Sequence, residues 1–132
     1  MTAAEIPAGV AATIDGYTSA WSAGDLQRVA DLWAHEENLS YVAEELSEIL
    51  TDRDRIVQHL LQTQHRLAQS TVSVKDLAVQ RLDEHLALAT FICRWELDWT
   101  SYSRVAVILR RKDSRWWFIH YMESPFHLEN WD

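Results

Sequence analysis

The sequence predicts a single α+β domain over residues 1–132, with helices packed on one face of an antiparallel sheet. Two observations lead to this fold class. Apolar residues recur at helical spacing in the first half of the chain, and they alternate with polar residues, as in strands, in the second half. No linker, repeat or low-complexity tract interrupts the chain, and its length suits one domain with a substantial core.

Three helices are expected in the first half of the chain. The first ends at Gly24, because glycine readily closes a helix, and its apolar stripe is Ile6, Val10, Ile14, Tyr17 and Trp21. Asp25 can cap a second helix, whose buried residues would be Leu26, Val29 and Trp33. A third helix is expected from the sequence TDRD (51–54) to about Gln69, with an inward face of Ile56, Leu60, Leu61 and Leu67.

The remaining elements are predicted to be strands. A short strand at 39–43 can pair with residues 48–50. Four longer strands follow at 72–82, 86–99, 104–111 and 115–125, joined by turns at 83–85, 100–103 and 112–114. Helices followed by a meander of strands are typical of a sheet that is covered on one side.

The charge and residue inventory excludes several classes of partner and cofactor. Lys and Arg number 12 and Asp and Glu number 20, a net charge of −8, so we expect no nucleic-acid partner and no anionic membrane surface. A zinc site needs clustered His and Cys ligands and a phosphate loop needs clustered glycines. The chain has neither, so we predict no metal and no cofactor. The single cysteine and the lack of a signal peptide or membrane span favour a cytoplasmic protein.

The last predicted strand, RWWFIHYMESP (115–125), is apolar on both faces. Under strict alternation, Trp117, Ile119, Tyr121 and Glu123 lie on one face and Trp116, Phe118, His120 and Met122 on the other. The helices can cover only one face of the sheet. We therefore expect a homodimer in which sheet packs against sheet and buries an outer face made of Val105, Val107, Trp116, Phe118 and Met122.

Three stretches of the sequence resemble one family. They are GYTSAWSAGDLQRVADLWAHEENLSYV (16–42), the helix after TDRDRI (51–56), and VAVILRRKDSRWWFIHYMESP (105–125). Together they are similar to the nuclear transport factor 2-like superfamily, above all its SnoaL-like group of small bacterial proteins, with ketosteroid isomerases and the kinase association domain as relatives. The resemblance implies a cone-shaped cystatin-like fold, with three N-terminal helices packed on a strongly bent antiparallel sheet. It also implies a ligand pocket at the open end of the cone and a sheet-to-sheet homodimer.

The resemblance also bears on chemistry. It places Tyr17 where ketosteroid isomerases have a tyrosine that donates a hydrogen bond to the developing oxyanion. Those enzymes also use one aspartate as a base and a second, protonated aspartate as a donor. The two positions fall near Ser40 or Tyr41 and near Ala106, none of which is a carboxylate. Steroid isomerisation is therefore excluded.

Six residues are candidates for the site. Glu123 is either an acid or base beside an aromatic wall, or a rim glutamate paired with an arginine. Tyr17 is a catalytic hydrogen-bond donor or a core tyrosine. Arg104 is expected to share the inward register of Ala106 and to meet a carboxylate ligand or Glu123, unless it is a surface charge. The expected ligand-binding walls are Tyr41, Trp95 and Tyr121, the last two of which can also be plain core.

Two functions from different classes remain open. The first is a protein that binds a hydrophobic small molecule in the cone, with the option of an isomerase, cyclase or dehydratase reaction in which Glu123 and Tyr17 are the catalytic residues. The alternative is a non-catalytic dimerisation or association module, which the missing aspartates favour. Ligand binding is the function that we expect.

Overall fold

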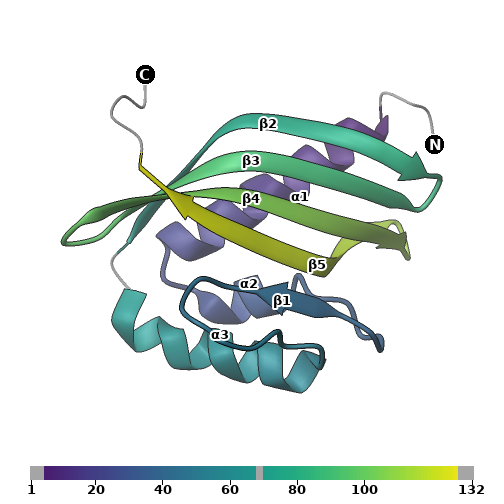
Figure 1. The fold of residues 1–132 in the computed structure, drawn as a ribbon. Coiled ribbons are helices and arrows are strands. Elements are labelled where there is room, and N and C mark those ends of the chain that lie inside the picture. The colour runs from purple at the N-terminus through teal and green to yellow at the C-terminus, as the bar shows by residue number, and fades with distance from the viewer. Residues whose placement is uncertain (1–4, 68–69, 128–132) are drawn as a thin grey trace.

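The computed structural model of the protein describes residues 5–67 and 70–127, with side chains throughout except at 64–67. Its helices and strands are α1 (Glu5–Ser22), α2 (Leu26–Ala30), β1 (Ser40–Val42), α3 (Arg53–Leu67), β2 (Thr71–Asp83), β3 (Leu86–Glu96), β4 (Thr100–Lys112) and β5 (Arg115–Phe126). The five strands form one sheet in the order β1-β5-β4-β3-β2. The four long strands curve together over α1, and α2 and α3 lie beside the β1 edge (Figure 1).

The ends of the first two helices follow from the local sequence. After α1, Gly24 adopts a left-handed φ of 69°, a backbone conformation that glycine takes without steric cost. The Asp25 carboxylate accepts a hydrogen bond from the backbone N–H of Arg28 at 3.2 Å and so caps α2. The predicted helix end at Gly24 and the predicted cap at Asp25 are both confirmed.

The expected packing of three helices on the sheet is right only in part. α1 is the long helix that crosses the sheet and contacts β2, β3 and β5, whereas α3 packs mainly against α2. α2 ends at Ala30, so the buried Trp33 lies beyond it and forms a backbone bridge with Phe118. None of the helices described is long and apolar enough to cross a membrane.

The inward face of α3 differs from the expected one at one position. Ile56 and Leu60 are buried as predicted, but Leu61 is 36% exposed because the buried stripe continues to Thr63 instead. The side chain of Leu67 and the predicted helix end at Gln69 lie outside the described part of the chain.

Two features of the sheet depart from the prediction. The sheet is not purely antiparallel, because β1 runs parallel to β5. The turn between β3 and β4 lies at 97–99 and not at 100–103, because residues 100–103 pair in register with 93–96. The expected pairing of the short strand with 48–50 is confirmed as a single bridge between Tyr41 and Leu50.

A bulge at Ile119 decides which side chains of β5 face the concave side of the sheet. His120 pairs with Ile108 of β4, and Phe118 pairs with the next residue of β4, Leu109, so Ile119 has no partner in this ladder. The extra residue reverses the alternation. The inward residues of β5 are therefore even-numbered before the bulge and odd-numbered after it. The inward row of β5 is Trp116, Phe118, Tyr121 and Glu123.

This register corrects the expected dimer face. Val105, Val107, Trp116 and Phe118 are at most 4% exposed, because they belong to the core under the helices and not to the outer face. Met122 alone of the five expected residues lies outside, with 48% of its surface exposed.

The close packing of β5 on α1 depends on a glycine. A Cβ atom added at Gly9 would lie 2.9 Å from Nε1 and 3.2 Å from Cδ1 of Trp116. The Trp116 ring therefore rests against the backbone of α1, where any side chain would displace it. This contact holds the first half of β5 on the helix and leaves the second half to line a cavity.

Candidate functional site

A cavity of about 140 Å³ opens on the concave side of the sheet, beyond the end of the core. Its walls come from α1, α3 and four of the strands, together with the loop after β1 and the turn between β3 and β4. The lining residues are Trp21, Tyr41, Glu44, Glu45, Thr63, Trp95, Leu97, Trp99, Ser101, Tyr121 and Glu123.

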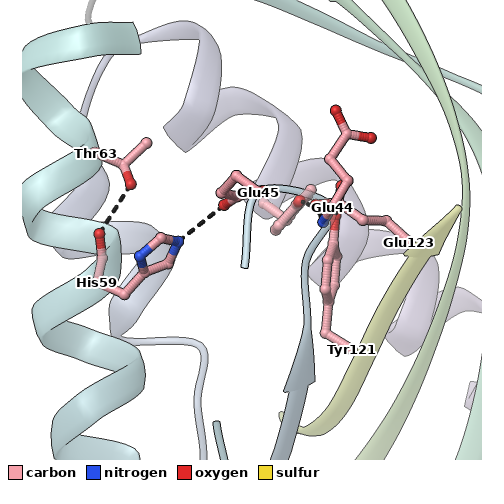
Figure 2. A network of polar contacts seen from close by, with 7 residues as sticks. Glu44, Glu45, His59, Thr63, Tyr121 and Glu123 are labelled. Carbon is pink, nitrogen blue, oxygen red and sulfur yellow. Dashed lines mark hydrogen bonds and ion pairs between the residues drawn. The ribbon is translucent and has the colours of Figure 1, made fainter. Parts of the chain in front are cut away.

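A chain of hydrogen bonds runs from the core to this cavity. The buried Tyr17 hydroxyl donates to the Tyr121 hydroxyl at 3.1 Å. Tyr121 in turn donates to Oε2 of Glu123 at 3.1 Å, and the backbone N–H of Glu44 donates to the other oxygen, Oε1, at 3.2 Å. Figure 2 shows Glu123 between Tyr121 and the loop that carries Glu44. Both oxygens of the carboxylate are therefore held in place.

The local folding explains why these side chains meet. Tyr121 and Glu123 are two residues apart on β5, past the bulge, so both project inward. Parallel pairing of β1 with β5 places Tyr41 beside Tyr121, and their rings stack at 5.4 Å between centroids with 18° between planes. The loop after β1 then brings Glu44 to the end of β5, where Glu123 lies.

The environment of Glu123 favours its protonated form. Burial is the largest cause that raises the pKa of the Glu123 carboxyl, and the negative charges of Glu45 and Glu44 raise it further. The hydrogen bonds from the Glu44 backbone and the Tyr121 hydroxyl lower it in part. The resulting pKa is about 7, against an ordinary value of 4.5. Glu123 can therefore either give or take a proton near neutral pH.

The three tyrosines around Glu123 are neutral donors. Burial raises the pKa of the Tyr17, Tyr41 and Tyr121 hydroxyls well above 10, and the Glu123 charge adds to the effect in each case. A neutral phenol keeps its proton, so Tyr17 and Tyr121 can stabilise a charged Glu123 without competing for the titrating proton.

A second polar group lies at the α3 side of the cavity. His59 Nε2 lies 2.8 Å from Oε1 of Glu45, and the Thr63 hydroxyl donates to the His59 carbonyl at 2.9 Å (Figure 2). The His59 ring also lies 5.7 Å from the Tyr41 ring. Burial and the nearby Glu45 charge raise the pKa of Glu44. Three carboxylates thus gather around one cavity.

The structure brings most of the predicted site residues together. Tyr41, Trp95, Tyr121 and Glu123 line the cavity, and Tyr17 lies directly beneath it as the first donor of the hydrogen-bond chain. The inward orientation expected of Arg104 is wrong.

Arg104 lies on the outer face of the sheet. Its neighbour Val105 is the buried residue of the pair, so Arg104 is exposed and its guanidinium stacks over the Phe126 ring at 4.6 Å. Ala106 shares this outer face. Ser40 also points away from the cavity, because its hydroxyl lies 2.5 Å from Nδ1 of His120.

Several lining residues were not predicted from the sequence. In the sequence, Trp21 belongs to the apolar stripe of the first helix, and Glu44 and Glu45 follow the predicted short strand with no role assigned to them. The signal that could have found the two glutamates is their place just after β1, but it requires knowing that β1 pairs with β5. Among the residues described, no group of three or more His, Cys, Asp and Glu is arranged to hold a metal ion.

Comparison with known proteins identifies one matching family model. The model is that of an NTF2-like protein, DUF6841, and it matches residues 4–125. A search of curated proteins finds no match.

Solved structures similar to the chain share its fold. A candidate calcium/calmodulin-dependent protein kinase II association domain from Xanthomonas campestris has a TM-score of 0.75 at 19% identity, over 89% of this chain and 85% of that one. A domain of unknown function with a cystatin-like fold from Nostoc punctiforme has a TM-score of 0.77 at 18% identity, over 98% and 82%. A candidate scytalone dehydratase from Novosphingobium aromaticivorans has a TM-score of 0.72 at 12% identity, over 90% and 83%. At such identities the likeness shows a cystatin-like fold and nothing of function.

Proposed function

The chain belongs to the NTF2-like DUF6841 family, and on that premise we propose that it binds a small molecule in the Glu123 cavity and transfers a proton there. The predicted membership of the nuclear transport factor 2-like superfamily is confirmed by this match and by the fold. The reaction classes that we propose are isomerisation, cyclisation and dehydration, because each requires one group to take or give a proton.

One observation carries the proposal. Glu123 lies beside the aromatic wall of the cavity, oriented by two donors and titrating near pH 7. A carboxyl group that only held the fold together would not need both a cavity and a neutral-range pKa, and this combination is typical of acid–base sites. Tyr121 lies next to it and can donate to an oxygen on which negative charge develops.

The ketosteroid isomerase arrangement is absent from the corresponding positions. Ser40 hydrogen-bonds His120, Tyr41 is a stacked wall residue, and Ala106 is on the outer face. Glu123 on β5 is therefore the proton carrier that we propose in place of the isomerase aspartates. The likeness to a candidate scytalone dehydratase supports only the fold on which such chemistry occurs.

Proton transfer can be tested without the natural substrate. Small ketones and aldehydes are incubated with the protein in D₂O, and exchange of the hydrogen next to the carbonyl is followed by NMR. We expect faster exchange with the parent protein and a loss of roughly a hundred- to ten-thousand-fold with Glu123→Gln, which keeps the shape but cannot carry the proton. Glu48→Gln is the matched control, because Glu48 is exposed, pairs with Arg55 and does not line the cavity.

Ligand entry can be tested separately through tryptophan fluorescence. Trp95 lines the cavity in edge contact with Trp21, with 5.0 Å between ring centroids, so a ligand should quench it. We expect Trp95→Phe to remove most of the response. Ligands that quench with the parent and produce no exchange would show binding without chemistry and remove Glu123 as the proton carrier.

The alternative proposal is a non-catalytic association module. It is favoured by the lack of carboxylates at Ser40, Tyr41 and Ala106, and the similar candidate kinase association domain shows that this fold occurs in a protein named for association. We also propose that a second copy of the chain covers the outer face, where Met122 is 48% exposed in a hollow shared with Ile92 and Ala106.

A further inference from the structure

The composition of the cavity wall points to the charge of its ligand. Building on the proposed function, we infer that the cavity takes a small organic cation, a molecule with an ammonium group, held between aromatic rings and the carboxylates of Glu45 and Glu123. The positive charge on the ligand is a new element, because the sequence analysis predicted a hydrophobic molecule and expected Arg104 to meet a carboxylate group of the ligand or Glu123.

Aromatic rings form the largest part of the wall. Five of the eleven lining residues are aromatic: Trp21, Tyr41, Trp95, Trp99 and Tyr121. Trp99 is 61% exposed at the turn between β3 and β4 and lines the cavity, so its ring is accessible to a ligand. The faces of Trp and Tyr attract cations, and groups of such rings are the usual receptors for ammonium ligands.

Negative charge is the second component. Glu44, Glu45 and Glu123 line the same cavity, and no Lys or Arg is among its lining residues. The charges of Glu44 and Glu45 act on Glu123, so they repel one another across the space that a ligand would enter. A cation in that space would relieve the repulsion, whereas an anion would increase it. His59 contacts Glu45 from α3, and within the part of the chain that the structure describes the Glu44 and Glu123 carboxylates form no ion pair with a basic side chain.

A third observation points to a ligand independently. Trp21 is 4% exposed and lines the cavity, and its Nε1 has no hydrogen-bond partner among the described residues. A buried N–H without an acceptor is costly, and a ligand oxygen would satisfy it. The ligand that suits the wall best therefore carries a cationic nitrogen together with a hydrogen-bond acceptor.

The size of the cavity bounds the ligand. Its volume of about 140 Å³ is below the ~300–1,000 Å³ of sites for drug-sized molecules, so the ligand is small. No group of His, Cys, Asp or Glu side chains among the described residues is arranged to hold a metal ion, and this includes the three carboxylates of the cavity. An organic ammonium group therefore suits their spacing better than a bare metal ion does.

Three isosteric probes test the charge directly. Choline, its neutral carbon analogue 3,3-dimethylbutan-1-ol, and the anion 3,3-dimethylbutanoate have the same bulky end and differ in charge. Binding is measured by calorimetry and tryptophan fluorescence. We expect choline to bind about tenfold more tightly than the alcohol, and the anion to bind least. Glu45→Gln and Trp99→Leu should each weaken choline binding several-fold while the alcohol is unaffected by Glu45→Gln. Glu48→Gln is the control and should change neither.

The outcomes separate this inference from the proposed function. If the alcohol binds as tightly as choline, the cavity takes ligands but the cation preference is overturned. If the carboxylate binds best, the inference is also overturned. If none of the three binds, the inference fails, and the fluorescence screen and the exchange assay still decide the proposed function. Tighter choline binding that Glu45→Gln leaves unchanged would place the cation outside this cavity and overturn the assignment.

Discussion

The hydroxyl of Tyr121 lies 3.1 Å from Oε2 of Glu123, two residues further along the same strand and on the same face. The same hydroxyl accepts from Tyr17 at 3.1 Å, so Tyr121 both receives and gives a hydrogen bond in a buried position. Chains of this kind polarise each member in turn, and a change at the far end is felt at the carboxylate. The titration of Glu123 is the quantity through which this relationship can be measured.

We predict that Tyr121→Phe raises the pKa of Glu123 further. The hydrogen bond from Tyr121 lowers that pKa, and the variant removes it while keeping the ring. NMR titration of the side-chain carboxyl carbon gives the pKa directly. Tyr17→Phe is the matched variant and should have the smaller effect, because Tyr17 does not contact the carboxylate. An unchanged or lower pKa in Tyr121→Phe would mean that the donated bond is absent in solution.

We predict that Glu123 makes the protein less stable as pH rises from about 4.5 to about 7. The folded-state pKa is raised above the unfolded one, so in this range the folded state binds more protons and the free energy of unfolding falls with pH. The decrease in the free energy of unfolding is at most about 3 kcal/mol. It reaches its full size above pH 7 and is absent below pH 4.5. Urea unfolding of Glu123→Gln at several pH values should give a flatter profile and a more stable protein at pH 8. A variant with the parent's pH slope would contradict the prediction.

We predict opposite effects of alanine at two glycines of α1. Gly9→Ala should destabilise the protein by about 1–3 kcal/mol, because the new Cβ would lie 2.9 Å from Nε1 of the buried Trp116. Gly16→Ala meets no atom within 4 Å and should stabilise by about 0.5–1 kcal/mol through helix propensity. Thermal and urea unfolding measure both. Equal stability of the two variants would mean that Trp116 does not rest on the helix.

We predict that charge on the outer face prevents self-association. Met122→Arg and Ala106→Arg place a cation in the hollow that we propose a second copy covers, so the mass measured by light scattering should fall to that of a monomer. Leu82→Arg is the control: Leu82 is 47% exposed but does not line the hollow. A parent protein that is monomeric at all concentrations, or variants that stay dimeric, would contradict the proposed interface.

The sequence predicted the elements well because their signals are local. The apolar stripe from Ile6 to Trp21, the glycine at position 24 and the cap at Asp25 each act within a few residues. The side-chain directions along β5 could not be predicted in the same way. Strict alternation assigned Trp116 and Phe118 to the outside, and one unpaired residue, Ile119, reverses that assignment for half of the strand.

The candidate site was predictable where it lies on β3 and β5 and not where it depends on distant pairing. Trp95 follows from the uninterrupted alternation of β3, and Tyr121 and Glu123 lie on the expected face because the bulge comes before them. Glu44 and Glu45 could not be found, because only the parallel pairing of β1 with β5 brings their loop to the cavity. Such contacts carry no local sequence signal.

The bulge at Ile119 lets β5 hold one residue more than the facing stretch of β4, and it sets which side chains reach the cavity. Deleting Ile119 would place His120 directly after Phe118 and leave the ladder otherwise unchanged, so Tyr121 and Glu123 would still face the cavity. If Ile119 instead joined the ladder while Trp116 and Phe118 kept their places, every later side chain of the strand would change sides. His120 and Met122 would then enter the cavity, and Tyr121 and Glu123 would face outward, so one residue left out of the ladder decides the chemical character of the cavity while the core stays intact.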